Sequence, residues 1–237
     1  MIARGLWVLV PLKQLRRGKE RLAAVLTGPE RRALVAAMAR DVLAALRAVP
    51  VAPARIVLVS DDEEVAGLAA EHGVAVFRPA PAAADPLNAA LTEALEHVRA
   101  HGAEHALVMH ADLPLADAFG LRNLLEAHAA SLAARGAPLA TLVTDRAGEG
   151  TNCLLSTPPG ALACRFGAGS RRLHHEAACA AGVRCEEFEG DGLGRDIDQP
   201  EDLAELVALC QSAENVVGVQ TAQLLRRRAP AGRRDSY

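Results

Sequence analysis

The stretch from Ala106 to Leu115, ALVMHADLPL, constrains the fold of this chain more than any other. Its first residues are apolar, as is typical of a strand that is buried on both faces of a parallel sheet. His110, Ala111 and Asp112 interrupt this run, and Pro114 prevents the strand from continuing. Open α/β sheets bind ligands at the carboxyl ends of their strands, so Asp112 is a candidate for a metal or phosphate site. The simpler alternative is a loop aspartate that caps the next helix.

Strand-like and helix-like segments alternate along the chain. Apolar runs predict strands at 6–12, 55–60, 74–77, 106–109, 139–144, 153–156 and 184–188. Helical periodicity predicts helices at 29–48, 63–72, 86–100, 118–135, 171–181 and 200–209. This alternation predicts an α/β fold with a doubly wound, mostly parallel, Rossmann-like sheet in three layers, α/β/α. We expect one domain over residues 1–210 and a basic, mobile C-terminal extension over residues 211–237.

Composition and charge argue against several classes of partner. The net charge is −3 and only 3% of the residues are aromatic, so the chain lacks the features of a nucleic-acid-binding protein. No run approaches the length of about 18 apolar residues that a membrane helix needs. The five cysteines include no C-x-x-C pair and are interpreted as reduced thiols, so we expect a cytoplasmic protein.

A basic segment follows the first predicted strand directly. It contains Lys13, Arg16, Arg17, Gly18, Lys19 and Arg21. Such a loop is a candidate cradle for a polyphosphate, although it lacks the spacing of a Walker A motif. The alternative is the solvated start of a helix.

Acidic and glycine-rich turns follow the later strands. Asp85 is placed to cap the helix that begins at Pro86. In the loop DRAGEGTN, Gly148 and Gly150 suit positive φ angles and an anion-binding nest. Ser170 is interpreted as the N-cap of a helix that follows the turn RFGAG, where free N–H groups favour an anion.

Asp196 and Asp198 stand two residues apart near the end of the chain. If this segment is extended, both carboxylates project from one face. Asp198 could instead cap the following helix. Together with the basic loop, these carboxylates and N–H groups suit phosphoryl or nucleotidyl transfer, in which catalysis rests on positioning and charge neutralisation.

An ordered set of motifs across residues 8–206 resembles one known family. The motifs are VPLKQLRRGKERLA, DPLNAAL, HADLPL, DRAGEGTN, RFGAGSRRLHHEA and DIDQPEDL. They resemble the 2-phospho-L-lactate guanylyltransferases of coenzyme F-420 biosynthesis, which include variants acting on phosphoenolpyruvate or 3-phosphoglycerate. That family lies among the nucleotidyltransferases related to molybdenum-cofactor guanylyltransferases.

The resemblance implies that GTP and a phosphorylated three-carbon acid give a guanylated acid diphosphate and pyrophosphate, with magnesium as cofactor. It also implies a downstream transferase of the deazaflavin pathway as a partner. The oligomeric state is left open, with a homodimer as one candidate. His110 departs from the smaller or amide residues expected before A-D-L-P.

The resemblance assigns roles to matching positions. Lys13, Lys19 and Asp112 would be catalytic. The nucleotide would contact Leu12, Lys13, Lys19, Arg21, Asp85, Pro86, Leu87 and Asn88. The phosphoacid would contact Thr151, Gly167 and Ser170. Magnesium would bind Asp112 with Asp198, and Asp196 is a further candidate ligand.

Two alternatives stay open. The first is another nucleotidyltransferase, with a sugar phosphate or molybdopterin as acceptor, although the segment LKQLRRGKERL lacks the G-x-G-T-R pattern of sugar-1-phosphate enzymes. The second is a nucleotide-binding module without catalysis. The presence of Lys13, Asp112, Ser170 and Asp198 together argues against it.

Overall fold

Seven strands form one sheet in the computed structural model, which describes residues 2–12, 19–81, 84–190, 192–212 and 216–228. The strand order is β3-β2-β1-β4-β6-β5-β7. The strands are β1 (Leu6–Pro11), β2 (Ile56–Val59), β3 (Ala75–Phe77), β4 (His105–Met109), β5 (Leu139–Thr144), β6 (Thr151–Thr157) and β7 (Arg184–Glu187). Among these described strands, β6 alone runs antiparallel to its neighbours β4 and β5. The carboxyl ends of the other six therefore meet at one edge, where β6 begins.

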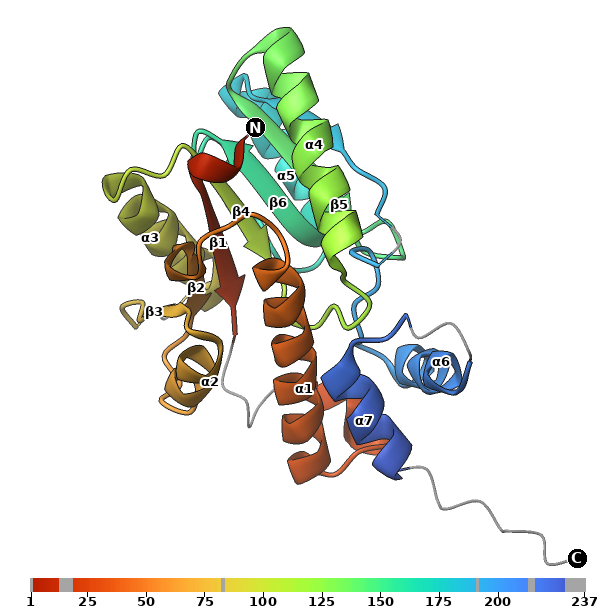
Figure 1. The fold of residues 1–237 in the computed structure, drawn as a ribbon. Coiled ribbons are helices and arrows are strands. Elements are labelled where there is room, and N and C mark those ends of the chain that lie inside the picture. The colour runs from red at the N-terminus through yellow and green to blue at the C-terminus, as the bar shows by residue number, and fades with distance from the viewer. Residues whose placement is uncertain (1, 13–18, 82–83, 191, 213–215, 229–237) are drawn as a thin grey trace, which may run out of the picture.

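Helices cover both faces of this sheet, which confirms the three-layer, doubly wound fold. The helices α1 (Gly28–Arg47), α2 (Val65–His72) and α4 (Ala118–Arg135) share one core with the sheet. On the other face, α3 (Pro86–Ala100) and α5 (Ser170–Ala181) share a second core with it. Figure 1 shows α1 and α4 in front of the sheet and α5 behind it. None of the described helices is long and apolar enough to cross a membrane.

Local sequence signals explain where the main elements begin and end. All five residues of β4 are buried, as expected for a strand covered by helices on both faces. Thr27 and Glu30 form a capping box at the start of α1, with Pro29 in its first turn. Gly73 adopts a φ of 65° and ends α2, as its sequence predicts.

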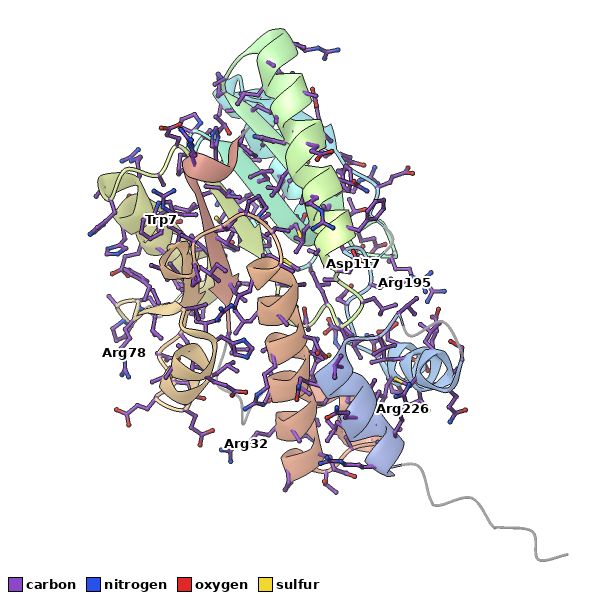
Figure 2. All side chains as sticks on the ribbon, in the orientation of Figure 1. Trp7, Arg32, Arg78, Asp117, Arg195 and Arg226 are labelled. Carbon is purple, nitrogen blue, oxygen red and sulfur yellow. The ribbon has the colours of Figure 1, made fainter. Side chains whose placement is uncertain are left out.

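A third core lies beyond the edge of the sheet. It joins α1, the short 3-10 helix η3 (Glu20–Ala24), α6 (Pro200–Gln211) and α7 (Val219–Arg228). Figure 1 shows α7 lying against α1, with α6 beside it. Arg226 lies on α7 (Figure 2), and its Nε and Nη2 donate to the Cys210 carbonyl at 3.2 and 3.1 Å.

This packing corrects the expectation of a mobile extension for residues 219–228. The buried Asp41 carboxylate accepts the N–H groups of Gln220 at 2.9 Å and Thr221 at 2.8 Å, and so caps α7 from α1. A Cβ on Gly218 would lie 2.2 Å from Asp41 Cγ, so only glycine permits this approach. The polar sequence VQTAQLLRRR does not indicate a packed helix, because the packing of α7 depends on a partner 180 residues earlier. Residues 229–237 lie outside the described part of the chain.

Candidate active site

The Lys19 ammonium joins two carboxylates at the carboxyl edge of the sheet. Lys19 follows β1, Asp112 follows β4, and Asp198 precedes α6. Lys19 Nζ donates to Asp112 Oδ2 and, at 2.5 Å, to Asp198 Oδ1. The Lys19 side chain is 6% exposed, whereas those of Asp112 and Asp198 are 24% and 45% exposed. The cation is therefore the most buried member of this group.

The backbone at Lys19 adopts an unfavourable conformation. Its φ of 57° and ψ of 46° are left-handed, which is uncommon for a residue with a side chain. Such a conformation costs roughly 1–2 kcal/mol, which the two ion pairs have to offset.

Burial and charge act in opposite directions on these groups. Burial alone would lower the pKa of Lys19, but the charges of Asp112 and Asp198 outweigh it and raise that pKa. Burial would likewise raise the pKa of Asp112, but the Lys19 ammonium holds it below its usual value. The pKa of Asp196 is raised, first by burial and then by the charge of Asp112. We call Asp112, Asp196 and Asp198 the acidic cluster, because their charges influence one another.

The segment that carries two members of the cluster is fixed by its neighbours. Ile197 is buried in the third core, so Asp196 and Asp198, on either side of it, are left partly exposed. Arg195 Nη1 donates to Glu205 of α6 at 2.9 Å, and Figure 2 shows Arg195 close to this helix. The Asp198 N–H donates to Asp202 Oδ2 at 3.0 Å. Gln199 forms the capping box of α6, so Asp198 is not the cap.

The acidic cluster offers the type of donor that a divalent cation takes, in an arrangement that Lys19 now occupies. Asp112 Oδ1 is buried and has no hydrogen-bond partner among the described residues. Carboxylate oxygens are the protein ligands that magnesium prefers. Within the described chain, no three acidic, histidine or cysteine side chains already surround a common point, and Lys19 Nζ stands between Asp112 and Asp198. A metal would therefore have to displace this ammonium.

The segment Asp85–Asn88 opens α3. Asp85 is its N-cap, as predicted, and accepts the Asn88 N–H at 3.4 Å with a φ of 46°. Asp85 and Pro86 are exposed, and Leu87 is half-buried.

Asn88 links α3 to the turn that precedes α5. Its Nδ2 donates to the Asp85 carboxylate at 2.8 Å and to the Phe166 carbonyl at 2.9 Å. Its Oδ1 accepts the Phe166 N–H at 2.8 Å. Its Nδ2 already donates to two partners, so a donor contact from this amide to a nucleotide would have to replace one of these bonds, and the structure gives Asn88 a linking role.

Two of the three predicted phosphoacid residues begin an element, and the third lies in a turn. Thr151 begins β6 and Ser170 begins α5, and both are buried. Gly167 has a φ of 123° in the turn between them. The prediction that Ser170 is the N-cap is wrong, because Gly169 takes that position with a φ of 67° that glycine adopts readily. Its carbonyl accepts the Leu173 N–H at 3.1 Å.

The loop DRAGEGTN is only partly as predicted. Gly148 has a φ of 70°, but Gly150 has no positive φ. Glycine is required at 150 for space, since a Cβ there would lie 2.5 Å from Asp145 Oδ2. The N–H groups of Gly148 and Glu149 donate to Asp145 at 3.1 and 2.9 Å, so these two are not free for an anion. Arg171 of α5 holds the loop by donating to the Gly148 carbonyl at 3.1 Å.

An open pocket of about 540 Å³ lies where the loop DRAGEGTN meets the start of α5. Its lining is mostly basic or glycine: Gly148, Glu149, Gly169, Arg171, Arg172 and His175.

The remaining predicted residues follow β1. Leu12 is buried, and its N–H donates to the Val59 carbonyl at 3.0 Å. Arg21 is exposed on η3. Lys13 lies outside the described residues.

Comparison with known proteins identifies the family. Residues 6–216 match the family model described as "Guanylyl transferase CofC like". The chain belongs to this family. It is 40% identical over 204 residues to a phosphoenolpyruvate guanylyltransferase of Rubrobacter xylanophilus, covering 86% of this chain and 94% of the relative. It is 39% identical over 199 residues to one of Sphaerobacter thermophilus, covering 84% and 90%.

Structural similarity confirms the fold of this CofC-like protein. A candidate nucleotide-diphospho-sugar transferase from Desulfovibrio desulfuricans G20 superposes with a TM-score of 0.73 at 15% identity. The match covers 94% of this chain and 97% of that one.

Sequence reasoning missed three residues that lie beside the candidate site residues. His174 bonds to Thr151 Oγ1 at 3.0 Å, and Asn152 Nδ2 donates to Asp196 Oδ1 at 3.2 Å. Phe166 packs against both His174 and His110, with ring centroids 5.0 and 5.2 Å apart. His110 therefore contacts this turn. The signal for all three is their position inside the motifs GEGTN and RFGAGSRRLH.

Proposed function

We propose that this guanylyl transferase joins GTP to phosphoenolpyruvate and releases pyrophosphate. As a member of its family the protein is a nucleotidyltransferase, and the relatives reported above are phosphoenolpyruvate guanylyltransferases. The product would be a guanylated enolpyruvyl diphosphate. This compound would serve coenzyme F-420 biosynthesis through a downstream transferase.

In this reaction a phosphate oxygen of the acid attacks the α-phosphorus of GTP. A bond forms between that oxygen and the α-phosphorus, while the bond from the α-phosphorus to the β-phosphate oxygen breaks. The attacking oxygen is already anionic at neutral pH, so the step requires no side-chain base. The protein has to bring two anions together and neutralise the charge that develops.

The nucleotide side of the proposed site contains Lys19, with Lys13 and Arg21 from the same segment. When a triphosphate enters, the Lys19 ammonium can exchange its carboxylate partners for phosphate oxygens. Asp112, Asp196 and Asp198 would then be free to hold magnesium, which neutralises phosphate charge when bound. The buried, unpartnered Asp112 Oδ1 supports this role.

The acid side of the proposed site contains Thr151, Gly167 and Ser170. It lies at the amino end of α5, where the first N–H groups and the helix dipole favour an anion. Asn88 ties the turn at Phe166 to α3, so the two substrate segments are mechanically connected.

The single observation that carries the proposal is Lys19 between Asp112 and Asp198 in a chain of this family. The test measures pyrophosphate release from GTP with phosphoenolpyruvate, 2-phospho-L-lactate and 3-phosphoglycerate in turn, with and without magnesium. We expect phosphoenolpyruvate to give the highest kcat/KM, GTP to outcompete ATP, and EDTA to abolish the reaction.

Other outcomes assign other functions. A preference for a different acid would keep the reaction and change the acceptor. Turnover with a sugar phosphate or molybdopterin, or equal use of ATP, would favour another nucleotidyltransferase. GTP binding without pyrophosphate release from any acid would favour a module without catalysis.

A further inference from the structure

His174 lies inside the molecule at the junction of the acid-binding elements. It is 0% exposed on the inner face of α5. Its Nδ1 lies 3.0 Å from Thr151 Oγ1 at the start of β6. Its Nε2 accepts the Arg165 N–H of the preceding turn at 3.0 Å. One imidazole therefore joins three segments that would surround the phosphoacid.

The hydrogen bonds determine which ring nitrogen carries the proton. A backbone N–H can only donate, so His174 Nε2 must present its lone pair to Arg165. Burial, the largest influence, lowers the pKa of His174 to about 4, so the ring is neutral near pH 7. A neutral imidazole has one N–H, which must then be at Nδ1.

This tautomer determines what the Thr151 hydroxyl can do. His174 also hydrogen-bonds the Ser170 backbone, but because its Nδ1 carries a proton, Thr151 Oγ1 can only accept from this nitrogen and its own hydrogen has to point elsewhere. Thr151 is 3% exposed and begins the strand that opens at the site edge of the sheet. A hydroxyl constrained in this way is preorganised as a donor to an anion, and it does not have to break another bond first.

The ring is prevented from turning by its neighbours. Phe166 packs edge-on against His174, with ring centroids 5.0 Å apart and an interplanar angle of 77°. The backbone of Phe166 is in turn held on both sides by Asn88, at 2.8 and 2.9 Å. A ring flip would put Cδ2 and Cε1 where Nδ1 and Nε2 now lie, and would break the hydrogen bonds to Thr151 and Arg165.

We propose that His174 is a positioning residue that orients the Thr151 hydroxyl as a hydrogen-bond donor to the anionic end of the phosphoacid. This inference rests on the proposed function. His174 itself does not touch the acid; it acts through Thr151.

Two amide substitutions separate the two bonds of the ring. His174→Asn places an amide nitrogen near the position of Nδ1 and keeps a donor to Thr151, but it loses the acceptor for Arg165. His174→Gln places its amide near Nε2 and keeps that acceptor, but it loses the donor. A purely structural histidine would be replaced equally badly by both.

The experiment measures KM for phosphoenolpyruvate and for GTP in the wild type and in variants confirmed to be folded. It also measures the Kd of the acid by calorimetry. We expect His174→Gln to raise KM and Kd for the acid about 10-fold, the scale of one hydrogen bond to a charged group. We expect His174→Asn to stay within about 3-fold of the wild type, and KM for GTP to change less than about 2-fold in both.

A double variant tests whether His174 acts through Thr151. Thr151→Val removes the hydroxyl and keeps the shape, while Thr151→Ser keeps the hydroxyl and is expected to bind the acid normally. If the inference holds, His174→Gln adds nothing to the loss already caused by Thr151→Val. Should His174→Gln fail to fold, the contrast between Thr151→Val and Thr151→Ser in the His174→Asn background decides: equal affinities there would overturn the inference.

Failure of this inference differs from failure of the proposed function. The role of His174 would be overturned if the double variant lost affinity for the acid by the product of the two single losses, or if the acid KM of His174→Gln were unchanged. In either case the wild type would still guanylate the acid. A wild-type protein that neither binds nor guanylates any of the three acids would overturn both.

Discussion

Replacing Lys19 by methionine tests how the acidic cluster is neutralised. Methionine is similar in length to lysine but lacks the positive charge that contacts Asp112 and Asp198. Removing one partner of a buried pair costs about 3–5 kcal/mol, because the other charge is left uncompensated. Asp198 is 45% exposed and will be screened by water, so we expect a cost below this range, about 2–3 kcal/mol.

Thermal unfolding in EDTA and in magnesium measures this effect. For a chain of this size each kcal/mol corresponds to about 2–4 °C, so Lys19→Met should lower Tm in EDTA by roughly 4–12 °C. Magnesium should then raise Tm more in the variant than in the wild type, since no ammonium competes for the carboxylates. Arg172→Met is the matched control: it breaks an exposed i,i+4 pair with Glu176 and should cost less than about 0.5 kcal/mol.

Two results would refute this reasoning. An unchanged Tm in EDTA would mean that Lys19 does not compensate the buried charge of Asp112. An equal response of variant and wild type to magnesium, with normal folding, would mean that the ammonium and the metal do not share one site.

Three further predictions concern separate parts of the molecule. Asp112→Asn should lower turnover about 100-fold and abolish the effect of magnesium on Tm, as measured by pyrophosphate release and calorimetry. Burial lowers the pKa of His128 to about 4, so its stabilising effect is complete above pH 6.5 and disappears as the pH falls toward 4. In denaturant titrations the free energy of unfolding should fall by roughly 3 kcal/mol between pH 6.5 and 4. The fall should be smaller in His128→Gln, which has no imidazole to protonate. Gly218→Ala would force Asp41 away from the start of α7 and cost about 1–3 kcal/mol, measured as a fall in Tm.

The order of elements could be predicted because each helix and strand is indicated by the residues within and next to it. The apolar run before Asp112 is a strand of four or five residues in both the prediction and the structure. A proline in the first turn and a capping residue before it indicate where α1 and α3 begin. Since parallel strands end at one edge, the places of Lys19 and Asp112 after strands predicted that they lie near each other, whereas Asp198 was added to them by the family resemblance.

Contacts between distant segments could not be predicted in the same way. Helix α7 has a polar sequence, and its stability comes from a buried carboxylate 179 and 180 residues earlier. Asn88 is placed by sequence at the start of α3, but its partner is Phe166, 78 residues later. Neither sequence window contains the other partner, so no local pattern reveals these bonds.

The buried stripe of α5 shows where sequence reasoning could have gone further. Ser170, His174 and Ala178 are its buried residues, and they recur every four positions along one face of the helix. A polar side chain on a buried face has to find a hydrogen-bond partner, since leaving it unpaired is costly. Such a stripe therefore predicts a polar partner on the facing strand, and Thr151 is that partner. The spacing alone could have singled out His174, but only the Arg165 N–H on its other nitrogen tells which way the Thr151 hydroxyl must point.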